Sequence, residues 1–416
     1  MATTNPSATH PRIALLISSF HPVIGGGETH ARLLGGAWRR HGVDVFVITR
    51  RRLPESPVFE RVDDIPVYRV PPTGRPRLGK YLMLAPAYRE LVRRRAEYDL
   101  IYVCGLRVLG LAGVLAALRT GKPCVLRSES RGELCGDFIW RTVDGRLLPV
   151  RRALFGWLIA LRNCLLRRAA GFLAISADIR AEYEACGVPA ERIALLVNGI
   201  DPQRFAPADA VLRAARRREL ELPAAGRIWA YAGKLNRGKG LEFLLRVWRD
   251  YVAAHPGEFL VLIGSGGNQY LSCEAELRAA VQAHALAASV RFTGYVTNVA
   301  AWLQAADAFL FPSENEALPL ALLEALACGL PAIASDVGGM RDILRDGENG
   351  RRVAVHDAAA WRAAMERVVA APEQAAAWGR GGRETVLARF GIERCAGEHL
   401  ELFRALLAAG RKGGSA

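Results

Sequence analysis

The sequence repeats one pattern: a short apolar run, a loop, and then a longer stretch with helical periodicity. Apolar runs at 12–18, 100–104 and 124–127 each precede such a loop and helical stretch. Runs of this length are typical of buried strands, and strands that alternate with helices form a parallel sheet with helices on both faces. The pattern therefore predicts an α/β fold built on doubly wound parallel sheets.

The alternation is interrupted once and then starts again. Residues 199–226 are rich in turn formers and charged residues, and we expect them to form a hinge or linker. We predict a Rossmann-like domain on each side of it, at residues 1–198 and 227–385. The chain length also favours two domains. Residues 386–416 contain a final helix that we expect to pack back on the N-terminal domain.

The composition limits the choice of partner and compartment. The formal net charge is +15, which favours phosphate-bearing small molecules, anionic membranes or nucleic acid. Only the charge supports nucleic acid, so we expect no nucleic-acid partner. The eight cysteines have no CxxC or metal-ligand spacing and indicate free thiols in a reducing cytosol. The short apolar run near the N-terminus indicates a strand rather than a signal peptide, so we expect a cytoplasmic protein.

Two carboxylates occupy unusual positions in one stretch of the second half. Residues 311–339 read FPSENEALPLALLEALACGLPAIASDVGG. Pro319 is well suited to open a helix, and Glu324 then falls within an otherwise apolar helical run. A buried carboxylate must find a partner or lose its charge. Glu324 is therefore either a structural residue with a partner or, together with Glu316, part of a ligand site.

A basic loop is expected beside these carboxylates. Residues 233–240 read GKLNRGKG and contain Lys234, Arg237 and Lys239. Ligands of parallel sheets bind at the carboxyl ends of the strands, where this loop would meet the loop of Glu316 and those that begin at Gly264 and Gly294. Cations beside a helix N-terminus suit a diphosphate. The alternative is a solvated basic loop. With a nucleotide bound, we expect Glu324 to accept from ribose hydroxyls and Glu316 to contact a second polyol.

This ordered set of motifs resembles the family-4 retaining glycosyltransferases of the GT-B fold. The similarity includes Glu316 and Glu324 in their shared stretch, the loop GKLNRGKG, and the segments IGSGG, FTGYV, VNGID and DGENG in the same order. It extends over nearly the whole chain, from the loop GGGE at 25–28 to the last helix. The resemblance implies two Rossmann-like domains that face each other across a cleft.

The resemblance also implies roles for individual residues. Glu324 would hold the ribose hydroxyls, Glu316 the hydroxyls of the donor sugar, and Lys234 and Lys239 the charge on the leaving diphosphate. The other implied donor contacts are Gly26 and Gly27 at the phosphates, Tyr295 and Val296 near the base, and the amides of Leu318, Pro319 and Leu320 at the distal phosphate, with Arg237, Gly264 and Ala317 beside them. No cofactor or metal is expected, since the nucleotide diphosphate sugar, UDP- or GDP-type, is a substrate.

The sequence departs from the family pattern at three positions. Lys234 stands where an arginine is usual, and lysine keeps the charge without the bidentate geometry. Ala317 replaces a glycine next to Glu316. Glu129, in PCVLRSESRGE, stands near the position of the family's histidine. Glu129 either replaces that histidine against sugar or acceptor, completing a catalytic set with Glu316, Lys239 and Lys234, or is a surface or salt-bridged residue.

The sequence thus predicts a metal-independent glycosyltransferase. It would move a hexose-type sugar to an acceptor hydroxyl with retention, in cell-envelope polysaccharide, lipopolysaccharide or glycolipid synthesis. The alternatives are a nucleotide-sugar-binding module and a Rossmann oxidoreductase, although residues 25–27 lack the GxGxxG spacing. The segment 146–168 combines tryptophan and leucines with arginines. It is either a core helix with a solvated basic edge or an interfacial helix on an anionic membrane, with Arg151, Arg152, Arg162 and Asn163 in one sector.

Overall fold

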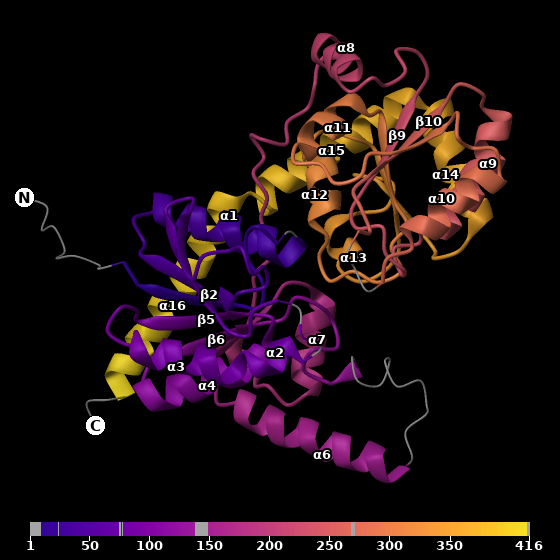
Figure 1. Cartoon of the computed structure of the whole chain (residues 1–416). Helices are drawn as coiled ribbons and strands as arrows, with labels where there is room; N and C mark the ends of the chain where they lie inside the picture. Colours follow the sequence, from indigo (N-terminus) through magenta and orange to yellow (C-terminus); the bar gives the residue numbers. More distant parts are fainter. Residues whose placement is uncertain are drawn as a thin grey trace, which may run out of the picture. The chain divides into compact units, whose positions relative to one another are not determined.

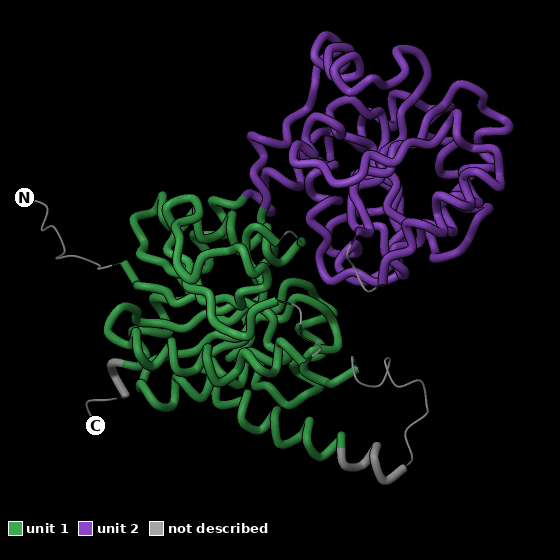
Figure 2. Tube along the Cα trace, in the orientation of Figure 1, with its two compact units in different colours: residues 1–199, 392–416 green, residues 200–391 purple. Residues whose placement is uncertain are grey.

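The computed structural model divides into two compact units, which Figure 2 shows in different colours. Unit 1 comprises residues 1–199 and 392–416, and unit 2 comprises residues 200–391. The residues described are 10–23, 25–74, 76, 78–137, 149–267 and 271–413, with the side chains of 149–154 and 411–413 excepted.

Unit 1 is built on an eight-stranded sheet with the order β3-β4-β2-β1-β5-β6-β7-β8. All neighbouring strands are parallel except β3 and β4, which are antiparallel. β1 and β5 are buried along their whole length because they are apolar on both faces. The edge strand β3, which the sequence pattern did not indicate, is largely exposed. The strands are β1 (Ile13–Ile17), β2 (Val45–Arg50), β3 (Phe59–Val62), β4 (Ile65–Val70), β5 (Leu100–Cys104), β6 (Cys124–Arg127), β7 (Gly171–Ala174) and β8 (Ile193–Leu195).

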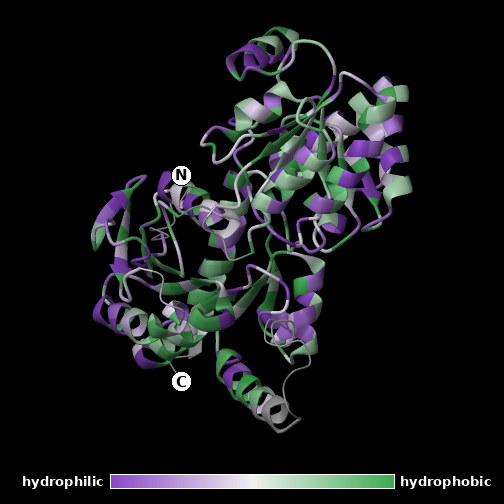
Figure 3. Ribbon diagram, turned by 45° about the vertical axis from the view of Figure 1, so that its right-hand side comes forward, coloured by the Kyte–Doolittle hydropathy of each residue, from purple (hydrophilic) through white to green (hydrophobic). Residues whose placement is uncertain are grey.

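Helices cover this sheet, as Figure 1 shows. Figure 3 shows hydrophobic strands in the interior of each unit and hydrophilic residues on the helices around them. The helices of unit 1 are α1 (Gly26–Arg40), α2 (Gly79–Leu82), α3 (Leu84–Arg93), α4 (Leu106–Thr120), α6 (Pro149–Leu166), α7 (Ala177–Ala185), the 3-10 turn η1 (Ala190–Arg192) and α16 (Ile392–Gly413).

The last helix, α16, completes the core of unit 1. It packs on α1, where the Trp38 Nε1–H donates to the Ala396 carbonyl at 3.3 Å. Arg40 pairs with Glu393 at 2.6 Å at the surface, and Phe403 packs edge-on against Trp38. The boundary expected at 386 lies a few residues too early, because the helix before α16 still belongs to unit 2.

Unit 2 contains a six-stranded parallel sheet with the order β11-β10-β9-β12-β13-β14. Residues 200–226, expected as a linker, belong to this unit: Arg217 of α8 is paired with Asp307 at 2.5 Å, next to β12. The strands are β9 (Ile228–Ala232), β10 (Phe259–Ile263), β11 (Val290–Phe292), β12 (Ala308–Phe311), β13 (Ala332–Ser335) and β14 (Arg351–Val353). The helices are α8 (Ala210–Glu219), α9 (Leu241–Ala254), α10 (Glu274–Ala283), α11 (Val299–Ala305), α12 (Leu320–Ala327), α13 (Met340–Ile343), α14 (Ala358–Ala370) and α15 (Pro372–Arg389).

Two histidines are buried in unit 1. His399 Nδ1 lies 2.7 Å from the Cys395 carbonyl, and its Nε2 lies 3.4 Å from the Tyr102 hydroxyl. Burial lowers the pKa of His399 to about 4. His30, on α1, has no hydrogen-bond partner at either ring nitrogen, and burial lowers its pKa well below the usual value. The folded unit therefore holds both rings neutral.

This burial makes unit 1 sensitive to acid. Below pH 6.5 the unfolded chain binds a proton at His399 that the folded chain does not, so stability is lost as the pH falls toward 4. For His399 alone the loss between pH 7 and pH 5 is about 2 kcal/mol. We expect His399→Gln to reduce the pH dependence of the free energy of unfolding by about this amount in denaturant titrations. The exposed His284→Gln is the control, and equal slopes in wild type and His399→Gln would contradict the prediction.

Candidate functional site

The candidate site lies where the sheet of unit 2 changes its winding direction. β9 and β12 are neighbours, but the chain continues from β9 to β10 on one side and from β12 to β13 on the other. Ligands of open parallel sheets bind at such a switch point, outside the carboxyl ends of the strands. The loop after β9 contains the basic residues expected to bind the ligand, and the loop after β12 contains Glu316.

Glycines allow these loops to approach one another closely. Gly240 has φ +67°, and a Cβ there would lie 2.0 Å from the Pro312 carbonyl oxygen. The Glu314 amide donates to the Gly238 carbonyl at 3.0 Å. On the other side, a Cβ at Gly339 would lie 1.8 Å from the Ala317 carbonyl oxygen. The positions of the β9, β12 and β13 loops are therefore mutually dependent.

The loops after β10 and β11 join the same edge. A Cβ at Gly264 would lie 2.0 Å from the Gly233 carbonyl oxygen. The Gly264 amide donates to the Thr293 hydroxyl at 3.1 Å. Tyr295, expected near the base, is 61% exposed, and Val296 is half-buried. The four loops expected to form the donor site thus lie side by side in unit 2.

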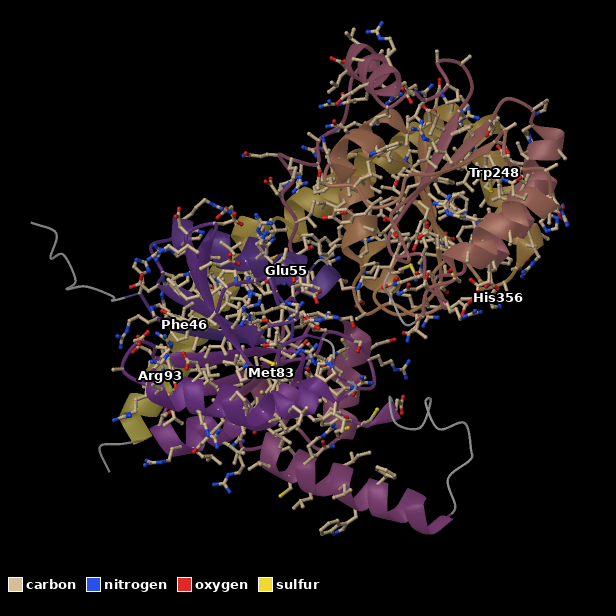
Figure 4. All side chains as sticks on the ribbon, viewed as in Figure 1. Phe46, Glu55, Met83, Arg93, Trp248 and His356 are labelled. Atoms are coloured by element: carbon tan, nitrogen blue, oxygen red, sulfur yellow. The ribbon has the colours of Figure 1, made fainter. Side chains whose placement is uncertain are left out.

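Lys239 and Glu316 form an ion pair at the centre of this edge. Lys239 Nζ lies 2.5 Å from Glu316 Oε1, and the Ser313 hydroxyl donates to the same oxygen at 2.7 Å. Glu314, two residues earlier, pairs with His356 at 2.9 Å; His356 is labelled on unit 2 in Figure 4. Glu316 is therefore held at a defined position, and Lys239 is already directed toward it.

The other two cations of the loop differ from each other. Lys234 is half-buried, and none of the described carboxylates pairs with its ammonium group. Arg237 pairs instead with Glu276 of α10 at 2.5 Å and lies 3.9 Å from Glu242 of α9. The expected group of three cations thus consists of two at the switch point and one that acidic residues of the neighbouring helices partly neutralise.

The helix after the β12 loop exposes a narrow strip. Its first helical residue is Leu320, and Pro319 is the N-cap, with no side-chain cap. Proline has no N–H, so the expectation that Pro319 donates an amide to phosphate is wrong. The amides expected to contact the phosphate are then those of Leu318 and Leu320.

All residues of α12 are buried except Ala321 and Glu324, which are half-buried. These two are one turn apart and share a face.

Glu324 lies in an environment that disfavours its charge. Burial raises the pKa of Glu324 to about 7, and the positive charge of Arg204 acts in the opposite direction. Arg204 donates to the Thr297 carbonyl at 3.0 Å, in the β11 loop. No role for Arg204 was expected from the sequence. The sequence feature that could have indicated a role for Arg204 is its position as a cation within the turn NGIDPQRFAP. Only the fold, however, brings that turn near α12.

In unit 1, Glu129 lies at the corresponding edge of the sheet. It follows β6, and its Oε1 is enclosed without a hydrogen-bond partner. A Cβ at Gly27, in the first turn of α1, would lie 2.3 Å from that oxygen, whereas a Cβ at Gly26 would meet nothing within 4 Å. Burial, and then the charge of Glu133, raise the pKa of Glu129 to about 7. The structure thus brings Glu129 and Gly27 together, and no described cation forms a salt bridge with Glu129.

Two buried acids hold the loop that carries Glu129. Glu133 accepts from the amides of Glu129 at 3.1 Å and Arg107 at 3.2 Å. Glu182 accepts from the amides of Gly132 at 2.6 Å and Leu134 at 2.7 Å. These acids determine the conformation of the loop. Neither acid could be recognised from the sequence, because the role of each depends on backbone groups that only the fold brings to it.

The described residues offer neither a metal site nor a membrane-spanning helix. No three His, Cys, Asp or Glu side chains among the described residues are grouped so that they could hold a metal ion. Within the same residues, no helix is both long and apolar enough to cross a membrane. Two doubly wound units, one of which carries a basic loop, Glu316 and Glu324 at its switch point, are the architecture of the GT-B class of glycosyltransferases.

Comparison with known proteins gives the family. Residues 213–385 match the family described as glycosyl transferases group 1, and residues 24–204 match glycosyltransferase family 4. A D-inositol 3-phosphate glycosyltransferase of Saccharomonospora viridis is 31% identical over 395 residues, or 89% of this chain and 87% of the relative. One of Xylanimonas cellulosilytica is 27% identical, over 96% of this chain and 97% of the relative.

Solved structures agree with this result. Sucrose-phosphate synthase of Thermosynechococcus elongatus has a TM-score of 0.78 and 27% identity, over 96% of this chain and 100% of the other. Anabaena HepE in complex with UDP-glucose has a TM-score of 0.75 and 20% identity, over 95% of this chain and 100% of the other. At this identity the similarity shows the fold alone. The chain belongs to the group 1, family-4 glycosyltransferases. The family and the GT-B fold expected from the sequence are confirmed, and the protein is a glycosyltransferase that uses a nucleotide sugar.

The close contact at Gly240 can be tested with a matched pair. Gly238 and Gly240 both have positive φ, but a Cβ at Gly238 would meet nothing within 4 Å. We expect Gly238→Ala to cost roughly 1–2 kcal/mol of stability from backbone strain alone. Gly240→Ala should cost about 2 kcal/mol more and weaken nucleotide binding, because the β9 and β12 loops must separate. Equal unfolding free energies and equal nucleotide affinities for the two variants would contradict this.

Proposed function

We propose that the protein transfers a hexose-type sugar from a nucleotide diphosphate sugar, UDP- or GDP-type, to an acceptor hydroxyl, with retention at the anomeric carbon and without a metal. The observation that carries the proposal is the arrangement at the switch point of unit 2, where Lys239 and Glu316 are paired. Lys234 lies on the same loop as Lys239, and Glu324 lies on α12, the helix that follows the loop of Glu316. Catalytic roles are proposed for Glu316, Lys239 and Lys234, and for Glu129 of unit 1.

The ion pair suggests how donor binding would change the site. Lys239 neutralises Glu316 at 2.5 Å in the structure. A diphosphate would compete for the ammonium group and release Glu316 to accept hydrogen bonds from hydroxyls of the donor sugar. As the sugar leaves, negative charge grows on the diphosphate. Lys239, Lys234 and the amides of Leu318 and Leu320 would stabilise it as preorganised donors, each worth about 3–4 kcal/mol.

Glu324 is proposed to bind the ribose. It is one of two half-buried residues on a buried helix, so the nearby surface can be covered by a ligand. Ribose hydroxyls donate to an ionised carboxylate, and hydrogen bonds to charged groups are the stronger ones. Because the pKa of the free Glu324 is about 7, donor binding should strengthen as the pH rises through 7.

The ribose proposal predicts a loss of donor affinity in Glu324→Gln. We expect the dissociation constant for the cognate nucleotide sugar to rise roughly 10- to 100-fold, as for the loss of hydrogen bonds to a charged group. Its pH dependence near pH 7 should disappear. Calorimetry at pH 6 and pH 8 measures both effects, and exposed Glu366→Gln is the control. Unchanged affinity in Glu324→Gln would exclude the ribose role.

The acceptor is proposed to bind to unit 1, near Glu129 and Gly27. We propose a cell-envelope polysaccharide, lipopolysaccharide or glycolipid precursor as acceptor. The relatives named D-inositol 3-phosphate glycosyltransferases favour a second candidate, a phosphorylated cyclic polyol. Transfer assays with UDP-, GDP- and ADP-sugars in the presence of EDTA, with the anomeric configuration of the product read by NMR, test donor, metal independence and retention. Loss of activity in EDTA or an inverted product would overturn the respective part of the proposal.

Helix α6 supports a peripheral membrane location, although not through the sector expected from the sequence. Arg162 and Asn163 point inward and donate to the Leu134 carbonyl at 2.7 and 2.9 Å. The outward face is apolar: Trp157 is 62% and Leu161 55% exposed. Arg151 and Arg152 lie outside the side chains described. The expectation that Arg162 belongs to a lipid-facing sector is therefore wrong, because its guanidinium donates to backbone carbonyls of the protein.

We propose that the apolar face of α6 binds an anionic membrane. Arg167 and Arg168, just beyond the helix, are exposed and would meet lipid phosphates while Trp157 and Leu161 enter the interface. We expect the double variant Trp157→Ser, Leu161→Ser to lose most of its flotation with phosphatidylglycerol vesicles at low salt.

A matched control separates this face from apolar exposure in general. Val58 of unit 1 is 60% exposed, and Val58→Ser should bind the vesicles like the wild type. Wild type that fails to float, or floats equally with pure phosphatidylcholine, would overturn the membrane proposal.

A further inference from the structure

The end of β2 carries a buried cation without a partner. Arg50, the last residue of the strand, is 7% exposed. Its Nε is enclosed and has no hydrogen-bond partner, and no described carboxylate forms a salt bridge with it. The terminal nitrogens, unlike Nε, are not among these enclosed atoms without a partner, and they are the atoms at which an anion would bind. Buried charges are normally paired, and guanidinium cannot escape by losing its proton.

The surroundings of Arg50 add positive charge. Arg52 lies close enough that its charge, after burial, lowers the pKa of Arg50. Arg52 Nη1 donates to the Ser19 hydroxyl at 3.0 Å, in the loop after β1. On the other side, a Cβ at Gly79 would lie 1.9 Å from Arg50 Nη1. The missing side chain at Gly79 thus leaves room for the guanidinium against the start of α2.

This corner lies at the same sheet edge as Glu129. β2 runs parallel to β1, which runs parallel to β5, so all three end at one edge. Arg50 is therefore about 10 Å, or two strand spacings, from the end of β5, where a Cβ at Gly105 would lie 3.5 Å from Oε2 of Glu129. Lys80, next to Gly79, is close enough for its charge to act on Glu129. Arg50 and Glu129 can therefore contact opposite ends of one small molecule.

We propose that Arg50, with Arg52 and Ser19 beside it, binds a phosphate group carried by the acceptor. The inference rests on the proposed function in taking unit 1 as the acceptor-binding unit. A guanidinium fork binds phosphate through two parallel hydrogen bonds, and the phosphate supplies the negative charge that unit 1 lacks here. The short distance to Glu129 fits a phosphorylated sugar or polyol, either free or as a lipid headgroup.

Inorganic phosphate tests the site without requiring transfer. Hydrogen exchange is compared in phosphate and in chloride at equal ionic strength, and only peptides of unit 1 covering 50–56 and 79–82 are evaluated, so that phosphate bound in unit 2 does not interfere. We expect at least fivefold slower exchange in the wild type and no effect of phosphate in Arg50→Gln. Arg89→Gln, which removes an exposed cation of unit 1, should behave like the wild type. Absence of protection in the wild type, or equal protection in Arg50→Gln, overturns the proposal.

A second variant separates ligand binding from a structural role. Arg50→Met keeps the aliphatic stem and removes the unpaired charge. If the charge is held for a ligand, the phosphate-free unfolding midpoint of Arg50→Met is equal to or higher than that of the wild type. A midpoint several degrees lower would assign Arg50 to the support of the fold and overturn the proposal.

Vesicles identify the source of the phosphate. If Arg50→Gln also loses binding to phosphatidylglycerol vesicles, the group is a lipid headgroup. If vesicle binding persists while phosphate protection is lost, the acceptor phosphate belongs to a water-soluble molecule. Neither readout depends on turnover, so phosphate protection without sugar transfer would refute the proposed function and leave the anion site intact.

Discussion

The close approach of backbones at the switch point of unit 2 is the constraint on which the candidate site depends. The loops after β9 and β12 can touch only because Gly240 has no side chain where the Pro312 carbonyl passes. That contact sets the distance at which Lys239 meets Glu316. Gly339 fixes the other side of the β12 loop in the same way. The chemistry of the site thus rests on positions that carry no functional group, since the glycines determine where the charged residues lie.

The two units use burial to similar effect. Glu324 in unit 2 and Glu129 in unit 1 are carboxyl groups whose pKa burial raises to about 7. Both lie where a ligand could approach, and neither forms a salt bridge with a described cation. A carboxyl group in this state changes its charge readily when a hydrogen-bond donor or a cation arrives. Arg237, by contrast, is paired with Glu276. Of the three cations of the basic loop, it is therefore the one whose charge is least available to a ligand.

Local patterns predicted much of the architecture. The buried strands, the glycine-rich loops and the positions of Lys239 and Glu316 follow from apolar runs and from the rule that parallel strands end at one edge. The pairing of Arg237 with α10, the role of Arg204 and the inward orientation of Arg162 could not be predicted. Each depends on a neighbour that is distant in sequence, a carboxylate or a carbonyl, which only tertiary packing brings into contact.

Two features of unit 1 reduce the stability of the isolated chain. An exposed apolar face, such as that of Trp157 and Leu161 on α6, leaves hydrophobic area in water. A buried guanidinium without an anion, as at Arg50, leaves desolvation uncompensated. Simple substitutions would relieve either cost. Both features lie in the unit that we propose binds the acceptor. An anionic group would compensate the second cost, and an apolar surface would compensate the first. The phosphorylated acceptor at or near a membrane that we propose would supply both, whereas a neutral soluble sugar would supply neither.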